Sequence, residues 1–314
     1  MIEAMRIAAA DEVSITDGRK TFFKPTTVAN AVEFKVANPT CVPVAGGTDV
    51  GVQINKLMRD PDVIMHLAAI EELRSIDVSA DAMTIGGLVT LAELERRTAD
   101  CCPELHAMFK RHGSPLIRNA GTLAGNIANG SPIGDALPAL YVLNAEVELA
   151  GRGGTRRINI NDFFTGYRKT VMAADELIVR VHIPLPRPGD VFKLYKVSKR
   201  WDLDISSFMA AIWARVTTGN TIDEIRIAYG GVGPNIIRAR RTEQFLTGQQ
   251  LTTDVMGKAG EIARSEVTPI SDVRGSAQFR FQLAENILQR FCAETNCETA
   301  TGLNAGGNGN GEAY

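Results

Sequence analysis

The sequence predicts an α+β protein of two domains, and three observations lead to this fold class. The chain has 314 residues, about twice the roughly 150 residues of an average domain. In its first part, short β-branched runs alternate irregularly with helical segments, whereas beyond residue 190 strand patterns come first and helix patterns follow. A proline-rich stretch from Pro184 to Asp190 separates the two parts.

The elements of the first part follow from local patterns. Strands end at glycines or prolines, and the strand at 41–45 stops at Gly46-Gly47. Thr90 and Glu93 have the spacing of a capping box, which opens a helix. We expect helices at 29–36, from 90 onward and at 105–111, strands at 41–45, 63–65, 83–85 and 177–183, alternating apolar residues at 140–150 and 157–160, and a long irregular segment at 113–135.

The second part predicts two long strands joined by a turn, then helices. We expect strands at 208–216 and 222–229, and helices at 241–247, 255–267 and 277–292. The tail from 301 to 314 is rich in Gly and Asn with almost no apolar content, so we expect it to be disordered.

Composition and charge exclude several classes of function. Lys and Arg number 34 against 36 Asp and Glu, so the net charge of −2 offers no positive field for nucleic acid. The first ten residues contain no apolar run long enough for a signal peptide or a membrane span. We therefore expect a cytoplasmic protein that binds neither nucleic acid nor membrane.

Cysteines and histidines also lack the spacing of a metal site. The five cysteines include no C-x-x-C pair, and the four histidines include no H-x-x-x-H or H-x-x-E-H arrangement. The sequence therefore predicts no disulfide framework, no zinc site and no iron–sulfur cluster in this chain.

A glycine loop follows the strand at 41–45. Two adjacent glycines let the backbone turn sharply and direct several N–H groups into one hollow, which suits an anion. The loop lacks the spacing of a P-loop or a Rossmann turn. Taken alone, Gly-Gly-Thr-Asp is also good material for an ordinary β-turn, which is the simpler interpretation. The loop consists of Val44, Ala45, Gly46, Gly47, Thr48, Asp49 and Val50.

A second candidate segment runs from 118 to 135. Its small residues permit close backbone approach, and its polar side chains, Thr122, Asn126, Asn129 and Asp135, offer hydrogen-bonding groups. Because an ordinary surface loop needs neither this length nor this alternation of small apolar residues, we expect a flat polar ligand to lie against it. Two further segments, 162–170 and 192–202, mix aromatic and basic residues and include Lys196, although a solvated lysine at a strand edge is the commoner explanation.

The ordered set of these motifs resembles the FAD-binding portion of the xanthine dehydrogenase family of molybdenum hydroxylases. The motifs are VAGGTDVG, IRNAGTLAGNIANGSPIGD, FFTGYRKT, FKLYKVSKR and YGGVGPNIIRARRTEQFL, and the resemblance covers roughly residues 22–292. It implies a vanillyl-alcohol-oxidase-type (PCMH-type) FAD-binding domain of two α+β lobes, then a C-terminal α+β domain of the CO dehydrogenase flavoprotein type. The implied division is an N-terminal connector at 1–21, the FAD-binding domain at 22–187, the C-terminal domain at 188–300 and the tail at 301–314.

The resemblance also implies which residues contact the cofactor. The glycine loop, Val44 to Val50, would wrap the FAD pyrophosphate. The segment after it would line the rest of FAD through Thr122, Leu123, Gly125, Asn126, Asn129 and Asp135, and Ile178 and Lys196 would approach the cofactor from two strands. It assigns this chain no catalytic acid or base and no metal ligand.

The sequence departs from the family pattern at two positions. Ala124 stands where relatives usually have the first glycine of Gly-Gly-Asn, so strain is expected if its backbone is left-handed. His112 occupies the place where an aromatic ring stacks near the flavin in the animal enzymes.

The activity that the resemblance implies is electron transfer. Electrons from purine hydroxylation at a molybdopterin unit would pass through [2Fe-2S] clusters on partner subunits or domains to FAD here, which would reduce NAD⁺. The chain would be one subunit of a hetero-oligomeric, xanthine dehydrogenase-type oxidoreductase in purine catabolism, inert toward xanthine alone.

Three alternatives stay open. The first is the flavin subunit of another molybdenum hydroxylase, acting on carbon monoxide, an aldehyde or an N-heterocycle. The second is a flavin-free scaffold protein, which a colourless purified sample would identify. The third, a UDP-sugar reductase, requires a proton-donating set of residues that the sequence does not contain. Whether oxygen replaces NAD⁺ as the electron acceptor depends on the segment 199–204.

Overall fold

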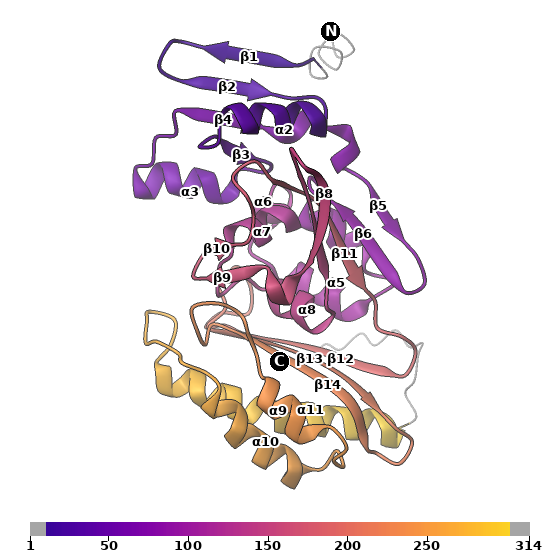
Figure 1. Cartoon of the computed structure of the whole chain (residues 1–314). Helices are drawn as coiled ribbons and strands as arrows, with labels where there is room; N and C mark the ends of the chain where they lie inside the picture. Colours follow the sequence, from indigo (N-terminus) through magenta and orange to yellow (C-terminus); the bar gives the residue numbers. More distant parts are fainter. Residues whose placement is uncertain (1–10, 302–314) are drawn as a thin grey trace.

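The fold is that of a computed structural model, which describes residues 11–301, with side chains described up to residue 295. Three large β-sheets follow one another along the molecule, each carrying its own helices (Figure 1), and a fourth sheet is a two-stranded hairpin. Of the predicted connector, residues 1–10 lie outside the described part, as do residues 302–314 of the tail. Residues Val13–Thr16 of that connector form strand β1 of the first sheet.

The first lobe is a mixed four-stranded sheet in the order β1-β2-β4-β3. Strand β1 pairs antiparallel with β2, whereas β2, β4 and β3 run parallel. Parallel neighbours require crossover connections, and α2 and α3 supply them. The elements are β1 (Val13–Thr16), β2 (Thr21–Lys24), α2 (Val28–Ala37), β3 (Val42–Val44), α3 (Thr48–Leu57) and β4 (Val63–His66).

The second lobe is an antiparallel five-stranded sheet in the order β5-β6-β11-β7-β8. Five helices connect β6 to β7. The elements are β5 (Ile76–Val78), β6 (Ala82–Gly86), α4 (Leu91–Arg97), α5 (Pro103–Lys110), α6 (Pro115–Arg118), α7 (Leu123–Asn129), α8 (Leu137–Val142), β7 (Glu146–Gly151), β8 (Gly154–Asn159) and β11 (Leu177–Pro184), with a small hairpin, β9 (Phe164–Gly166) and β10 (Lys169–Thr170).

The C-terminal domain is an antiparallel four-stranded sheet in the order β12-β13-β14-β15, followed by three helices. The link from β11 to β12 lies within the predicted boundary, Pro184 to Asp190. The elements are β12 (Asp190–Val197), β13 (Phe208–Val216), β14 (Ile222–Gly230), β15 (Ile237–Arg238), α9 (Arg240–Leu246), α10 (Thr253–Ser265) and α11 (Ala277–Thr301).

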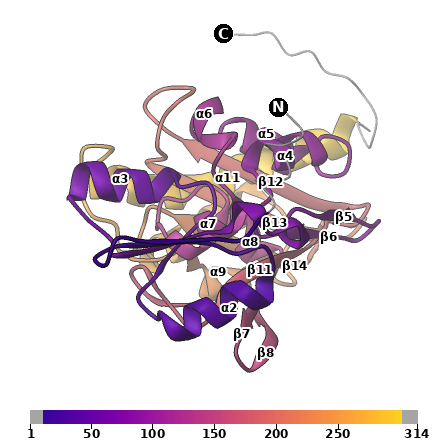
Figure 2. The same cartoon turned by 90° about the horizontal axis from the view of Figure 1, so that it is seen from above.

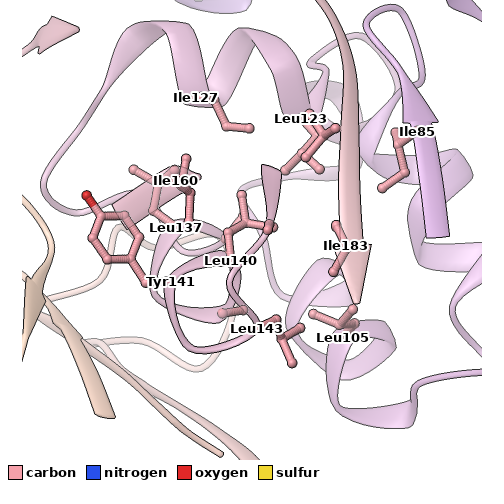
Figure 3. Packing of buried hydrophobic residues seen from close by; sticks show 14 of the residues in the cluster. Ile85, Leu105, Leu123, Ile127, Leu137, Leu140, Tyr141, Leu143, Ile160 and Ile183 are labelled. Carbon is pink, nitrogen blue, oxygen red and sulfur yellow. The ribbon is translucent and has the colours of Figure 1, made fainter. Parts of the chain in front are cut away.

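The central core joins the second lobe to the C-terminal domain. Helix α8 packs directly on β13 and β14, and its side chains Leu137 and Leu140 meet Ile183 of β11 in one buried cluster (Figure 3). Alternate residues of β13 belong to different clusters: Met209 and Ala211 face this core, whereas Ala210 and Ile212 face helices α9 to α11. The last sheet is therefore buried on both faces.

Most predicted elements are confirmed, including the capping box, in which Thr90 and Glu93 satisfy each other's backbone N–H groups. The segment 113–135 is not irregular throughout, and that prediction is wrong. Ser114 and Thr122 act as N-caps that start α6 and α7. Helix α8 also replaces the first part of the predicted alternation at 140–150. These helices are short, so they contain too few turns to show a helical period.

Two features are absent from the described residues. None of their helices is long and apolar enough to cross a membrane. Within the same part of the chain, no group of three or more His, Cys, Asp or Glu side chains could hold a metal ion.

Candidate functional site

A cavity of about 400 Å³ lies between the N-terminal end of α3 and one face of α7. Seen from above, α7 lies near the middle of the molecule and α3 at its edge (Figure 2). The cavity brings together two segments that are far apart in the sequence. Its walls are Pro43, Val44, Ala45, Gly46, Gly47, Thr48, Asp49, Val50, Val52, Gln53, Leu91, His112, Ile117, Gly121, Thr122, Gly125, Asn126, Ala128 and Asn129.

The glycine loop forms one wall, and its two glycines are required for different reasons. A Cβ atom at Gly46 would lie 1.6 Å from the carbonyl oxygen of Ala120, so only a bare backbone fits there. Gly47 has φ of 68°, in the left-handed region. Gly47 also precedes α3 without offering a side-chain cap. The first N–H groups of α3 have no partner inside the helix, and they can bind an anion.

Helix α7 forms the opposite wall. Thr122 caps the helix, and its Oγ1 accepts a hydrogen bond from the Gly125 N–H at 3.0 Å. Leu123 and Ile127 are buried in the core, which leaves the small residues Gly125 and Ala128 exposed on the other face. A helix face without large side chains lets a flat ligand lie close to the backbone.

The predicted strain at Ala124 does not arise. Ala124 lies inside α7, and it is not among the residues with positive φ. Its side chain is buried against the core. An alanine therefore replaces the family's glycine without a backbone penalty.

A second cavity, of about 300 Å³, adjoins the first. The two share the wall residues Pro43, Ala45, Gly125 and Ala128. Ile178 and Lys35 line only the second cavity. We call the two cavities together the groove, because a ligand of several connected parts could extend across their shared walls.

Asp135 and Lys196 are brought together, but not in the wall of the groove. Lys196 Nζ donates to Asp135 Oδ2 at 2.6 Å and to the Arg111 carbonyl at 2.8 Å. Ser206 Oγ donates to the other carboxylate oxygen of Asp135 at 2.5 Å. Both charged side chains are less than a tenth exposed. This buried pair ties the second lobe to β12.

His112 connects this pair to the groove, since it lines the first cavity and interacts electrostatically with Asp135 and Lys196. Burial lowers the pKa of His112, and Lys196 and Arg118 lower it further against the opposing effect of Asp135. The imidazole is therefore neutral at pH 7. Its Nδ1 is enclosed without a hydrogen-bond partner, as is Oδ1 of Asn126 in α7.

Most sequence-predicted residues meet in the groove. All seven residues of the glycine loop, together with Thr122, Gly125, Asn126 and Asn129, line the first cavity, and Ile178 lines the second. Leu123, Asp135 and Lys196 line neither. The Leu123 side chain lies in the core, and Asp135 and Lys196 bind each other.

Several wall residues were not predicted from the sequence. Gln53 follows Asp49 by one helical turn, and its Nε2 donates to the Asp49 carboxylate, so the i, i+4 spacing was an available signal. Gly121 and Ala128 lie inside the predicted segment 118–135, yet only the folded structure shows that they face the cavity. Lys35 gave no signal, because its burial depends on packing of α2 against the second lobe.

Comparisons with known proteins agree with this architecture. The FAD binding domain in molybdopterin dehydrogenase matches residues 16–186, and the CO dehydrogenase flavoprotein C-terminal domain matches residues 193–295. These two matches define a flavin-binding oxidoreductase subunit. The chain belongs to the family of FAD-binding flavoproteins of the molybdenum hydroxylases.

Individual relatives span several substrates. The xanthine dehydrogenase FAD-binding subunit of Escherichia coli O157:H7 is 30% identical over 87% of this chain and 95% of its own length. The nicotinate dehydrogenase FAD-subunit of Eubacterium barkeri is 29% identical over 86% and 94%. Xanthine dehydrogenase 1 of Arabidopsis thaliana is 28% identical over 88% of this chain, which spans only 21% of that protein.

Solved structures give the same picture. A chain of the carbon monoxide dehydrogenase from Hydrogenophaga pseudoflava superposes with a TM-score of 0.82 at 25% identity, covering 88% of this chain and 96% of that chain. A chain of quinoline 2-oxidoreductase from Pseudomonas putida superposes with a TM-score of 0.79 at 27% identity, covering 86% of this chain and 94% of that chain.

The groove fits the FAD that this family binds. The bare backbone at Gly46-Gly47 and the free N–H groups of α3 suit a diphosphate. Asn126 lines the same cavity and has an enclosed Oδ1 without a partner. The small face of α7 suits a planar ring. These residues can hold FAD without a metal or a catalytic side chain.

Proposed function

We propose that this chain is the FAD-binding electron-transfer subunit of a xanthine dehydrogenase-type molybdenum hydroxylase. It receives electrons from [2Fe-2S] clusters on a partner subunit or domain and passes them to NAD⁺ in the cytoplasm. A molybdopterin-binding partner performs the hydroxylation in purine catabolism. The chain alone is inert toward xanthine.

The observation that carries the proposal is the groove between the glycine loop and α7, in a chain whose relatives are flavoprotein subunits. FAD, when bound, supplies a carrier that accepts single electrons and donates a hydride. The chain's residues hold and orient it: the glycine loop and the first turn of α3 bind the diphosphate, and α7 supports the ring system.

The roles of the fifteen predicted contact residues are part of this proposal. Twelve of them line the groove, and we assign these twelve direct contacts with FAD. We assign Asp135 and Lys196 a positioning role, because their buried ion pair interacts with His112 in the wall of the groove. Leu123 holds α7 against the core.

A second candidate within the same family is supported by specific relatives. The nicotinate dehydrogenase FAD-subunit and the quinoline 2-oxidoreductase chain are nearly as similar to this chain as the xanthine dehydrogenase subunit. In this alternative the partner hydroxylates an N-heterocycle, an aldehyde or carbon monoxide, and the flavin subunit does the same work.

The first experiment is purification from native cells with its partners. Flavin absorbance, FAD released on denaturation, and a molybdopterin subunit and an iron–sulfur subunit identified by mass are expected. A folded but colourless protein that cannot be reconstituted with FAD would contradict the proposal and favour the scaffold alternative. Turnover with xanthine, nicotinate, quinoline, an aldehyde and carbon monoxide then separates the two candidates.

The electron acceptor is tested on the flavin-loaded chain alone. If NAD⁺ is the acceptor, anaerobic NADH bleaches the flavin absorbance in the reverse direction, within seconds and without any partner. Bleaching by dithionite but not by NADH would reject NAD⁺, and rapid reoxidation by air would indicate oxygen as the acceptor.

A further inference from the structure

Lys35 is a buried lysine at the wall of the groove. It lies on the inner face of α2, together with the buried Ala31, and only 8% of its surface is exposed. The side chain lines the second cavity, where Pro39, Pro43 and Ile178 are neighbours. Lysine is almost never buried to this degree without a partner.

No hydrogen bond or ion pair joins Lys35 to another residue in the described part of the chain. Its electrostatic neighbours are the Cys41 thiol and the Asp175 carboxylate. Asp175 already accepts the N–H of Arg152 at 2.9 Å. A second carboxylate in the cavity wall, Glu176, is held by Arg156 through two bonds of 2.5 and 2.7 Å. Neither acid therefore requires Lys35.

The charges around the groove are unbalanced for a dinucleotide. Among the described residues that line its two cavities, the acidic ones are Asp49 and Glu176, and Lys35 is the one lysine or arginine. A dinucleotide brings two negative charges on its diphosphate. Backbone N–H groups at the glycine loop supply only partial positive charge, so a full positive charge elsewhere in the groove would add to the attraction for the diphosphate.

We propose that Lys35 recognises the adenosine diphosphate half of FAD, and that it makes this site selective for FAD over flavin mononucleotide. This inference rests on the proposed flavin function. The isoalloxazine ring would lie in the first cavity, whose wall includes His112 and the half-exposed Ile117. The adenosine would pass the shared wall residues Ala45 and Gly125 into the second cavity, where the Lys35 ammonium group could donate hydrogen bonds to it and attract the diphosphate.

The geometry also makes a prediction about the protein without flavin. The Lys35 ammonium group is not among the enclosed polar atoms that lack a hydrogen-bond partner, so it reaches the open space of the second cavity while its carbon chain is buried. Because no hydrogen bond or ion pair of the described residues holds this group, the lysine is a binding residue whose removal should not destabilise the flavin-free chain. Structural lysines have the opposite property, because their removal destabilises the protein whether or not a ligand is present.

The test uses the full chain, stripped of flavin, in four forms: wild type, Lys35→Gln, Lys35→Met and the control Lys56→Gln. Lys56 is an exposed lysine in the last turn of α3 and lines neither cavity. Dissociation constants for FAD, flavin mononucleotide and ADP are measured by fluorescence and calorimetry, and thermal unfolding is measured on each flavin-free form.

Both Lys35 variants are expected to bind FAD and ADP about 10- to 100-fold more weakly, as for loss of a charge-assisted hydrogen bond. Their affinity for flavin mononucleotide is expected to stay within about 2-fold. Flavin-free Lys35→Met is expected to unfold no earlier than wild type, and Lys56→Gln to match wild type throughout.

Two results would overturn the inference while leaving the proposed function intact. One is unchanged FAD affinity in both Lys35 variants. The other is an equal loss for FAD and flavin mononucleotide, or a lowered unfolding temperature of the flavin-free variants, since each would indicate a structural role. Failure of wild type to bind FAD would instead refute the proposed function.

Discussion

The two walls of the groove are built in different ways. The glycine loop is shaped by its backbone: Gly46 lies against the Ala120 carbonyl, and Gly47 has a left-handed conformation. Helix α7 is an ordinary capped helix, whose buried face is apolar and whose exposed face carries Gly125 and Ala128. The glycine-loop wall needs glycines for its own backbone to fold. The α7 wall needs small side chains only to leave room for a ligand, since folding does not require them.

This difference separates folding from binding. A change in the glycine loop alters the fold and the ligand site together, because the loop contacts the segment before α7 directly. A change on the exposed face of α7 alters only the space left for the ligand. Four substitutions, from the largest expected effect to the smallest, test whether the walls differ in this way.

Gly46→Ala should have the largest effect. The added Cβ would overlap the Ala120 carbonyl carbon and oxygen, at 2.3 and 1.6 Å, and both are backbone atoms that cannot rotate away. We expect no retained FAD and a clearly lower unfolding temperature. Gly51→Ala, in open space on α3, is the matched control and should bind FAD normally. Normal flavin content in Gly46→Ala would disprove the close approach.

Lys196→Met tests the buried ion pair between Lys196 and Asp135. Removing the lysine leaves the Asp135 carboxylate buried without its cation, a change that typically costs about 3–5 kcal/mol. Urea unfolding should show this loss, and FAD should be retained at low temperature. Lys193→Met on the same strand, whose ion pair with Glu104 is more exposed, should cost about 1 kcal/mol or less. Equal losses in the two variants would argue against a special role for the buried pair.

Ala128→Leu tests the α7 wall. The larger side chain would occupy the space shared by both cavities, so FAD should bind about 10- to 100-fold more weakly. The free energy of unfolding of the flavin-free chain should not fall, since Ala128 is exposed and leucine is a good helix former. Titration of FAD into the flavin-free protein measures the first effect. A large loss of stability would show that the two walls do not differ as described.

His112 gives the smallest effect, which depends on pH. Its pKa is lowered from 6.5 by burial, so below pH 6.5 the unfolded chain binds a proton that the folded chain resists. Stability is therefore lost as the pH falls through this range. Between pH 7.5 and 5.5, wild type should lose about 1 kcal/mol more than His112→Asn. Burial also lowers the pKa of His66, but His66 is present in both wild type and His112→Asn. Parallel pH profiles would contradict the prediction.

The sequence predicted the long elements well and the short ones poorly. Strand β11 and helix α10 carry enough residues for their periods to be seen. Helices α6 and α8, of 4 and 6 residues, do not. Their starts are marked by caps or prolines alone, and α8 is buried on all sides because it lies between two sheets. Such a helix shows no amphipathic pattern to detect.

The site was predictable where the backbone determines it and less so where packing does. Gly46, Gly47 and Thr122 belong to motifs that the resemblance identifies. Lys196 was expected at the cofactor, but the structure places its ammonium group on Asp135, 61 positions away in the chain. Lys35 stayed unnoticed, because a lysine in an amphipathic helix is usually exposed, and only the fold shows that this one faces inward.

The two-sided burial of β13 has a consequence for dissecting the protein. The boundary near residue 188 separates two sequence families, yet cutting there would strip Leu137, Leu140 and Phe192 of the apolar surface that covers them. Each half would expose an apolar sheet or helix face to water, and we expect either fragment expressed by itself to aggregate. The two modules must therefore be produced and engineered as a single piece.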